Sequence, residues 1–349
     1  MPRRILFVIR SKLGDTLISY AAVRAYIDAH PQDQVTLLTR RNYAQLLEGE
    51  AGLRVIGFDS RIAMLCKLFW LRFTAPAFDV LGILFGSGAP IAAIGRWVRA
   101  RRKIAWNKKS APEIFEQGEL PADPTYVEPA MSVIHAFAPD VPMPMRMAIP
   151  SLAARYAAAA GGRSDVIGVA PLSDEVRRNF DGPALLILLA RLRQQDAAAK
   201  IRVFVNPDDD AARELMRTAL PENCEWYGFT DLRDLVDQYM HLRAWYGTDT
   251  GLFHMATSIG VPATVFFGPT QTYKSVLPGE PAVTKVRLAV LGESHCEQKT
   301  CTRPRCLHQA IADYCATPGP TPLEETPMDC PLRGFDLAAQ ERVRVGAAA

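Results

Sequence analysis

The sequence has no long hydrophobic run, although 49% of its 349 residues are hydrophobic. None of its apolar stretches approaches the roughly 20 residues that a membrane-spanning helix needs. The apolar stretch near the N-terminus, residues 5–9, is too short for the core of a signal peptide and runs directly into a loop motif. We therefore expect a protein that does not span a membrane and stays in the cytoplasm.

A strong charge of one sign is also missing, because 40 Lys and Arg residues face 37 Asp and Glu residues. This balance argues against a nucleic-acid partner. Positive charge does gather in one stretch, whose members are Arg96, Arg99, Arg101, Arg102, Lys103, Lys108 and Lys109. The stretch is either a solvated helix end with its following loop or a site for an anionic acceptor or lipid surface, which leaves peripheral contact with the inner membrane open.

The cysteines form no regular framework. In a chain of this length without an export signal, seven irregularly spaced cysteines favour reduced thiols over secreted disulfides. Four of them cluster late in the sequence, at Cys296, Cys301, Cys306 and Cys315. The cluster lacks the CxxC spacing of most structural zinc sites, so free thiols, disulfides and a zinc or iron site, in which His295 or His308 could replace a cysteine, all stay open.

Apolar segments rich in β-formers alternate with helical patterns along the chain, which predicts parallel sheets covered by helices on both faces. In the first half the predicted strands cover residues 4–9, 35–39, 55–58 and 78–85. In the second half they cover residues 166–170, 201–205, 244–247 and 263–267. A Pro-, Ala- and Gly-rich segment at 141–162 separates the halves. We expect two Rossmann-like domains, at 1–160 and 161–349.

The most informative segment spans residues 245–270 and predicts a strand, a turn, a helix, a second strand and a loop. Asp249, Thr250 and Gly251 fall at the start of the helix, where free backbone N–H groups can hold a diphosphate. His254 follows one turn later and can donate to the same anion. A capped helix with a buried polar histidine is the alternative, and the GlyProThr sequence at 268–270 favours the functional interpretation.

Residues 249–270 match the pattern DTGxxHxAxxxGxPxxxxFGPT, which resembles glycosyltransferase family 9, the heptosyltransferases of bacterial lipopolysaccharide synthesis. Residues 5–17, ILFVIRSKLGDTL, are similar to the N-terminal signature of that family. The resemblance covers residues 5 to about 270. It implies a GT-B fold, in which two Rossmann-like domains face an interdomain cleft, with the acceptor on the first domain and a nucleotide sugar on the second.

The resemblance also implies roles for individual residues. Asp15 corresponds to the proposed general base, whereas its position alone is that of a helix N-cap. In the segment 170–180, Ser173 and Arg177 keep the family spacing for diphosphate binding, with Arg in place of Lys and without the usual Trp; the alternative for Arg177 is a surface arginine. Asp208 corresponds to a ligand of the donor ribose, or else begins a solvated acidic helix.

The activity implied is an inverting transfer of a sugar, heptose first among the candidates, from an ADP-heptose-like donor to a lipopolysaccharide core or another surface glycan. No metal or other cofactor is then required, because Arg177, His254 and the helix start can stabilise the leaving diphosphate. Two alternatives stay open: a nucleotide-sugar epimerase of the same architecture, and a non-catalytic nucleotide-sugar-binding protein. Asp15 together with the DTGxxH segment favours the transferase. A dehydrogenase is disfavoured because no GxGxxG follows a predicted strand.

Overall fold

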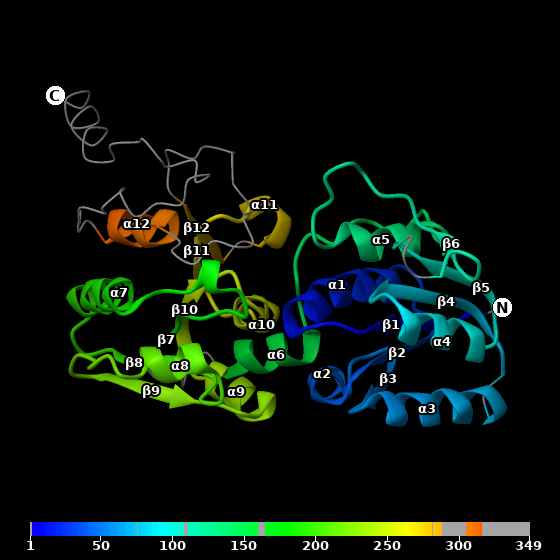
Figure 1. The fold of residues 1–349 in the computed structure, drawn as a ribbon, viewed down its shortest axis with the longest axis horizontal. Coiled ribbons are helices and arrows are strands. Elements are labelled where there is room, and N and C mark those ends of the chain that lie inside the picture. The colour runs from blue at the N-terminus through cyan, green and yellow to red at the C-terminus, as the bar shows by residue number, and fades with distance from the viewer. Residues whose placement is uncertain are drawn as a thin grey trace.

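A computed structural model describes residues 2–74, 76–107, 111–159, 165–280, 282–287 and 305–315. It contains two six-stranded sheets, one in each half of the chain, and helices cover both of them (Figure 1). Every strand pairs with its neighbours in parallel. Parallel strands need crossover connections, and the alternating helices supply them. The predicted fold class, α/β with two Rossmann-like halves, is confirmed.

The first sheet has its longest buried strands in the centre. In spatial order its strands are β3 (Leu53–Phe58), β2 (Gln34–Arg40), β1 (Arg4–Ile9), β4 (Phe78–Phe85), β5 (Ala100–Ala105) and β6 (Glu116–Gln117). The helices of this half are α1 (Leu13–Ala29), α2 (Arg41–Leu47), α3 (Arg61–Thr74), α4 (Ala89–Trp97) and α5 (Glu128–His135). Residues 5–9 of β1 are wholly buried, as expected of a strand with helices on both faces.

The second sheet repeats this architecture. In spatial order its strands are β12 (Val283–Arg287), β11 (Ala263–Phe267), β10 (Leu242–Thr248), β7 (Val166–Ala170), β8 (Lys200–Val205) and β9 (Cys224–Gly228). Its helices are the 3-10 turn η2 (Val176–Arg178), α7 (Gly182–Gln195), α8 (Asp210–Leu215), α9 (Leu232–Tyr239), α10 (Gly251–Ile259), α11 (Thr272–Ser275) and α12 (Arg305–Tyr314). All five residues of β7 are buried.

The two sheets share one strand order. The first strand in sequence lies beside the fourth in each, as β1 beside β4 and as β7 beside β10. At such a point the crossovers leave in opposite directions, and a crevice opens at the carboxyl ends of the two strands. Each half therefore has one position where a ligand site is expected.

The segment predicted to link the halves contains α6 (Pro150–Ala158), which lies between the two sheets in Figure 1. It packs against the second half: the Tyr156 hydroxyl donates to the carbonyl of Leu242 at 2.8 Å, and the Ile149 N–H donates to the carbonyl of Ser258 at 2.9 Å. The halves are thus joined by a packed helix as well as by the chain.

Two parts of the fold differ from the prediction. From Arg96 to Lys103 the basic stretch is the end of α4 followed by a strand, β5, instead of a loop, while Lys108 and Lys109 lie outside the described residues. Its charges are tolerated because β5 lies next to the short final strand β6, which leaves Arg101 exposed. The second sheet also continues past β11, the last predicted strand, into β12. Within the described residues, no helix is long and apolar enough to cross a bilayer.

Candidate active site

The candidate segments lie at the switch points of the two sheets. The loop after β1 leads into Asp15, and the loops after β7 and β10 carry residues 171–179 and 249–251. Because both crevices open at carboxyl strand ends, the geometry of each half favours ligand binding where the sequence places its motifs.

These two switch points meet where α1 crosses α10 (Figure 1). The close approach depends on two glycines. A Cβ added at Gly14 would lie 2.9 Å from Cδ2 of His254, and a Cβ added at Gly251 would lie 3.1 Å from the backbone nitrogen of Gly14. The crossing brings the start of α1, which carries Asp15, against the start of α10.

Asp15 lies in the first turn of α1 and is half-buried. It does not cap the helix, because Lys12 occupies the N-cap position. Its carboxylate instead accepts a hydrogen bond from the Ser11 hydroxyl. Burial raises the pKa of Asp15, against the opposing effects of Ser11, Lys12 and Arg178. A carboxylate with a raised pKa is a stronger base than a solvated one.

Asp249 follows β10 and is buried beside a cation. Its Oδ2 atom lies 3.1 Å from Nη1 of Arg178, and the Thr270 hydroxyl lies 3.5 Å from the same oxygen. Burial disfavours the charge of Arg178, but Asp249 and Glu175 more than offset this effect, so the pKa of Arg178 is raised. Arg178 stays positively charged at the mouth of the second crevice.

His254 is buried on the first turns of α10, with Nε2 3.8 Å from Oδ1 of Asp249. Burial lowers its pKa to about 4, although Asp249 opposes this shift. The imidazole is therefore neutral near pH 7 and can donate a hydrogen bond without carrying charge. The start of α10 adds backbone donors, since Thr250 is its N-cap residue and makes no side-chain capping bond.

Buried polar atoms without hydrogen-bond partners gather at this end of the second sheet. Among the described residues they belong to Arg177, Arg178, Thr248, Asp249, His254, Gln271 and Ser275. Leaving such an atom unpaired costs about 1–3 kcal/mol, so a concentration of them marks a place where a polar ligand would complete the hydrogen bonds.

The comparisons with known proteins decide the family. Glycosyltransferase family 9 (heptosyltransferase) matches residues 83–307, which is more than half of the chain. The chain belongs to glycosyltransferase family 9. No curated protein sequence matches it.

Solved structures of family 9 enzymes have the same fold. An E. coli heptosyltransferase, WaaC, with ADP-2-deoxy-2-fluoro heptose superposes with a TM-score of 0.65 at 16% identity, over 89% of this chain and 99% of that one. E. coli ADP-heptose lipopolysaccharide heptosyltransferase II gives 0.64 at 18% identity, over 90% and 98%. A family 9 glycosyltransferase from Veillonella parvula gives 0.64 at 15%, over 81% and 85%. The GT-B fold and the glycosyltransferase class predicted from sequence are confirmed.

In this family 9 chain, the predicted site residues divide into two groups. Asp15, Asp249, Thr250, Gly251 and His254 come together at the crossing of α1 and α10. The other three predicted residues, Ser173, Arg177 and Asp208, lie in the loops that follow β7 and β8.

Ser173 and Arg177 both shape the loop after β7. The Ser173 hydroxyl donates to the carbonyl of Glu175 at 3.0 Å and accepts from the Glu175 N–H. Arg177 is buried rather than on the surface, and its Nε donates to Glu175 at 2.6 Å. Asp208 is exposed at the end of β8, while its neighbour Asp209 accepts the capping bond of α8 from Ala211.

Sequence reasoning missed Arg178. The family spacing selects Arg177, but the 3-10 turn η2 points its neighbour at Asp249. The available signal was the pair of adjacent arginines, because only one side chain of such a pair can face the crevice while the other turns away. The ion pair of Lys12 with Asp174, at 2.9 Å between the halves, was also not predicted.

The first half has its own cavity at the carboxyl ends of β1, β2 and β3, with a volume of about 400 Å³. Arg10, Arg40 and Arg41 line it, and Asp59 pairs with Arg41 at 3.0 Å. Arg10 directly follows β1 and precedes the loop that carries Ser11. The cavity is therefore lined by positive charge, and one of its lining residues, Arg10, precedes Asp15 closely in the sequence.

The cysteine cluster is only partly visible. Cys296, Cys301 and His295 lie outside the described residues. Cys306 and Cys315 are buried on the α12 segment, and Nδ1 of His308 lies 3.2 Å from Asp181. Within the described ranges, no group of three or more His, Cys, Asp or Glu side chains is arranged to hold a metal ion.

Proposed function

We propose that this enzyme transfers a heptose, with inversion, from an ADP-heptose-like donor to a lipopolysaccharide core or another surface glycan. The second half binds the donor, and the first half binds the acceptor. The boundary between the two domains falls near residue 160, after α6. The observation that carries the proposal is the crossing of α1 and α10, where Gly14, next to Asp15, touches Gly251 and His254 of the donor half.

Asp15 acts as the general base. An acceptor hydroxyl gives its proton to the Asp15 carboxylate as its oxygen bonds to the anomeric carbon of the donor. The bond from that carbon to the diphosphate breaks on the opposite face, and the nucleotide diphosphate leaves with the electron pair. The raised pKa of Asp15 supports this role, and so does its position at the start of α1.

The leaving diphosphate is stabilised by groups of the second half. Arg178 supplies a permanent positive charge, the start of α10 supplies backbone N–H groups, and His254 supplies a neutral donor. Ser173 and Arg177 hold the loop that carries Arg178, and Asp208 is the candidate ligand of the donor ribose. With this charge available, the reaction needs no metal ion or other cofactor.

The acceptor occupies the cavity beside Arg10, Arg40 and Arg41. Guanidinium groups bind phosphates and carboxylates through paired hydrogen bonds, so the cavity suits an anionic saccharide and not an uncharged one. Such an acceptor would be met in the cytoplasm at the inner membrane surface, with no nucleic acid involved.

The test is a panel of nucleotide sugars. A ligand present at 100 times its Kd should stabilise the folded state by about 2.7 kcal/mol, which raises the melting temperature. We expect ADP-heptose to stabilise the protein more than UDP- or GDP-linked sugars. A larger effect from a UDP-sugar would overturn the heptose donor, and no effect from any member would overturn the donor site itself. Mass spectrometry of the product with a lipopolysaccharide-core acceptor then tests the transfer.

A further inference from the structure

Helix α3 is apolar on two opposite sides. Its inner side is formed by Met64, Leu68 and Leu71, which are all buried, and Met64 and Leu68 belong to the core under the first sheet. Its outer side is also apolar, and its members are Ile62, Leu65, Phe69, Trp70 and Phe73. Residues 62, 65, 69 and 73 recur every three or four positions, which places them in one stripe along the helix. We call these five residues the outer face of α3.

The outer face is exposed and continues onto α4. Ile62 is 75% exposed, Phe73 67% and Phe69 53%. The Phe69 ring lies 4.7 Å from the Phe73 ring and 6.0 Å from the ring of Trp97, which is itself 41% exposed. Single exposed apolar side chains are ordinary, but a contiguous aromatic patch is typical of an interaction surface.

The segment of the chain that carries this patch is strongly basic. Residues 54–103 contain nine Lys and Arg and only two Asp, whereas the whole chain is nearly balanced. Arg96 and Arg101 have exposed side chains, and their acidic neighbours Glu113 and Asp79 lie 3.4 and 3.6 Å away. These exposed pairs are weak and leave the arginines able to bind another anion.

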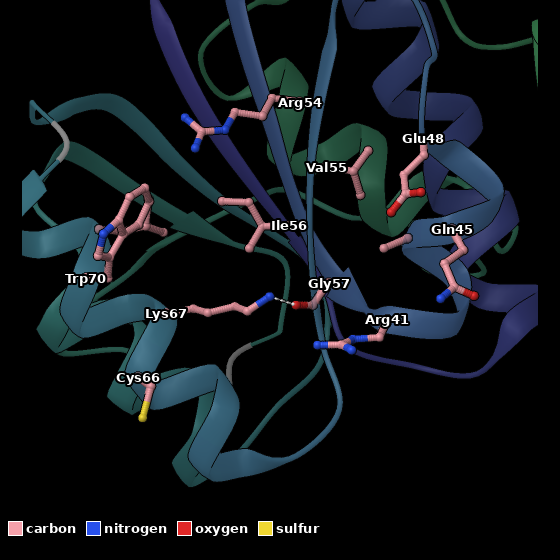
Figure 2. Close-up of a pocket in the computed structure, with 12 residues that line it drawn as sticks. Arg41, Gln45, Glu48, Arg54, Val55, Ile56, Gly57, Cys66, Lys67 and Trp70 are labelled. Carbon is pink, nitrogen blue, oxygen red and sulfur yellow. Dashed lines mark hydrogen bonds between the residues drawn. The ribbon is translucent and has the colours of Figure 1, made fainter.

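A basic cavity lies directly beside the outer face. It has a volume of about 650 Å³ between α2, β3 and α3 (Figure 2). Trp70 and Lys67 reach its edge from α3, while Arg54 comes from β3 and Arg41 from α2 (Figure 2). Cationic groups next to an apolar stripe match the two layers of a bilayer surface, which are phosphates above and acyl chains below.

We propose that the outer face of α3, together with Trp97, docks on an anionic lipid bilayer with the helix in the plane of the interface. The aromatic rings enter at the level of the headgroups and upper acyl chains, and the arginines around them bind lipid phosphates. Docking of a second copy of this chain is disfavoured, because a two-fold interface would place one basic patch against the other.

The N-terminal end of α3 borders the proposed acceptor site. Ser60 and Met64, at the start of α3, line the cavity that contains Arg10 and Arg40. If the proposed function holds, an acceptor anchored in the bilayer reaches this cavity without leaving the membrane surface. The docking itself needs neither sugar substrate.

The test is cosedimentation of the full chain with vesicles, in the absence of donor and acceptor. Wild type should pellet with vesicles of equal parts phosphatidylethanolamine and phosphatidylglycerol, and much less with pure phosphatidylcholine. Phe69→Glu/Phe73→Glu should lower the partition coefficient about 100-fold, because two aromatic anchors are replaced by charges. Arg96→Gln/Arg101→Gln should lower it about 25-fold, since each basic residue contributes about fivefold.

Met216→Glu is the matched control, because Met216 is an exposed apolar residue of the second half. It should bind vesicles as wild type does, and the unfolding midpoint of every variant should stay near that of wild type. Failure of wild type to pellet, or equal binding by the phenylalanine variant, would overturn the proposal. A dimer in sedimentation velocity that only the phenylalanine variant dissociates would also overturn it, and would assign the face to a second copy. None of these outcomes depends on transferase activity.

Discussion

The carboxyl edges of the two sheets share one topology but treat their polar groups differently. At the first edge, Arg40 and Arg41 line an open cavity, and Arg41 has an acidic partner in Asp59. At the second edge, Asp249 and His254 are almost fully buried, and each has an atom without a hydrogen-bond partner. One strand order therefore supplies an open, arginine-lined cavity in one half and a buried polar pocket in the other.

The difference has an energetic meaning. Groups at an open edge exchange bonds with water and contribute little to stability, whereas unpaired groups in a buried pocket lower stability until a ligand satisfies them. We expect substitutions at the first edge to act on the acceptor and on the rate, and substitutions at the second edge to act on donor affinity.

Asp15→Asn should give the largest effect, and it tests whether the first edge controls the transfer rate and the second edge controls donor affinity. The amide keeps the size of the side chain but cannot accept the proton, so the transfer rate should fall about 100- to 10,000-fold. Donor affinity should change little, because the donor is held by the other half. Rate and calorimetric affinity are measured side by side, with Asp174→Asn, an exposed carboxylate that pairs with Lys12, as the control.

The proposed role of Asp15 as a base also predicts that the transfer rate depends on pH. Because the pKa of Asp15 is raised in the folded protein, the carboxyl gains its proton earlier on acidification than a solvated aspartate does. The transfer rate should fall as the pH drops through this raised value, while donor binding persists. Turnover of Asp15→Asn within a few-fold of wild type would show that Asp15 is not the base.

A pair of variants at adjacent positions tests the second edge. Arg178→Gln should weaken donor binding by about 1–3 kcal/mol, since a charged donor to the diphosphate is lost. Arg177→Gln should weaken it less, because Arg177 is buried against Glu175. Calorimetry gives the affinities, and denaturation of each variant corrects for any loss of folded protein. If Arg177→Gln weakens binding more, the family spacing locates the anion contact correctly and the geometry at Asp249 does not.

The close packing of α1 against α10, which lies between the two edges, can be tested by a substitution at Gly14. Gly14→Ala adds a Cβ that would meet the ring of His254 at 2.9 Å, so α1 and α10 must move apart. The free energy of unfolding should drop by about 1–3 kcal/mol. In the control Gly228→Ala, the added Cβ meets only carbons of Pro207 at 3.5 Å or more. Urea denaturation of the two variants compares the sites, and equal stabilities would mean that the crossing adapts without strain.

The smallest effect concerns Glu280, whose carboxylate accepts from the Met147 N–H. Burial raises its pKa from 4.5 to about 7. The folded state therefore binds this proton more tightly than the unfolded state, and the resulting stability is fully present below pH 4.5 and lost as the pH rises through about 7. After solvent screening the loss should be about 1 kcal/mol.

Glu280→Gln should abolish this part of the pH dependence, because the amide oxygen still accepts the bond but carries no charge. Denaturation curves at pH 5 and pH 8 give the difference for each protein. An unchanged pH profile in the variant would show that Glu280 titrates as a solvated carboxyl.

Much of the fold follows from the sequence, because buried parallel strands leave apolar runs that a simple pattern detects, as in residues 5–9 and 263–267. The strands that escaped prediction, which are β5, β6, β9 and β12, lie at or next to the sheet edges, where charged and polar side chains interrupt the run. The candidate general base, Asp15, and the candidate diphosphate-binding residues, Thr250 and Gly251, were predicted because a helix begins at these positions shortly after a strand. The sequence could not predict which of Arg177 and Arg178 faces Asp249, since this depends on the direction of one 3-10 turn.

The contacts that join the two halves differ in strength along the cleft. One contact between the halves is the Lys12–Asp174 pair, whose side chains are both 67% exposed, and such a pair contributes about 0–1 kcal/mol. On the side of α6 they are joined by buried bonds, including that of Tyr156 to Leu242. Of these two contacts, the exposed pair at Lys12 is the easier to break and the buried bond of α6 the harder. Added salt would therefore weaken the Lys12–Asp174 contact and leave the buried bond of Tyr156 to Leu242 largely unchanged.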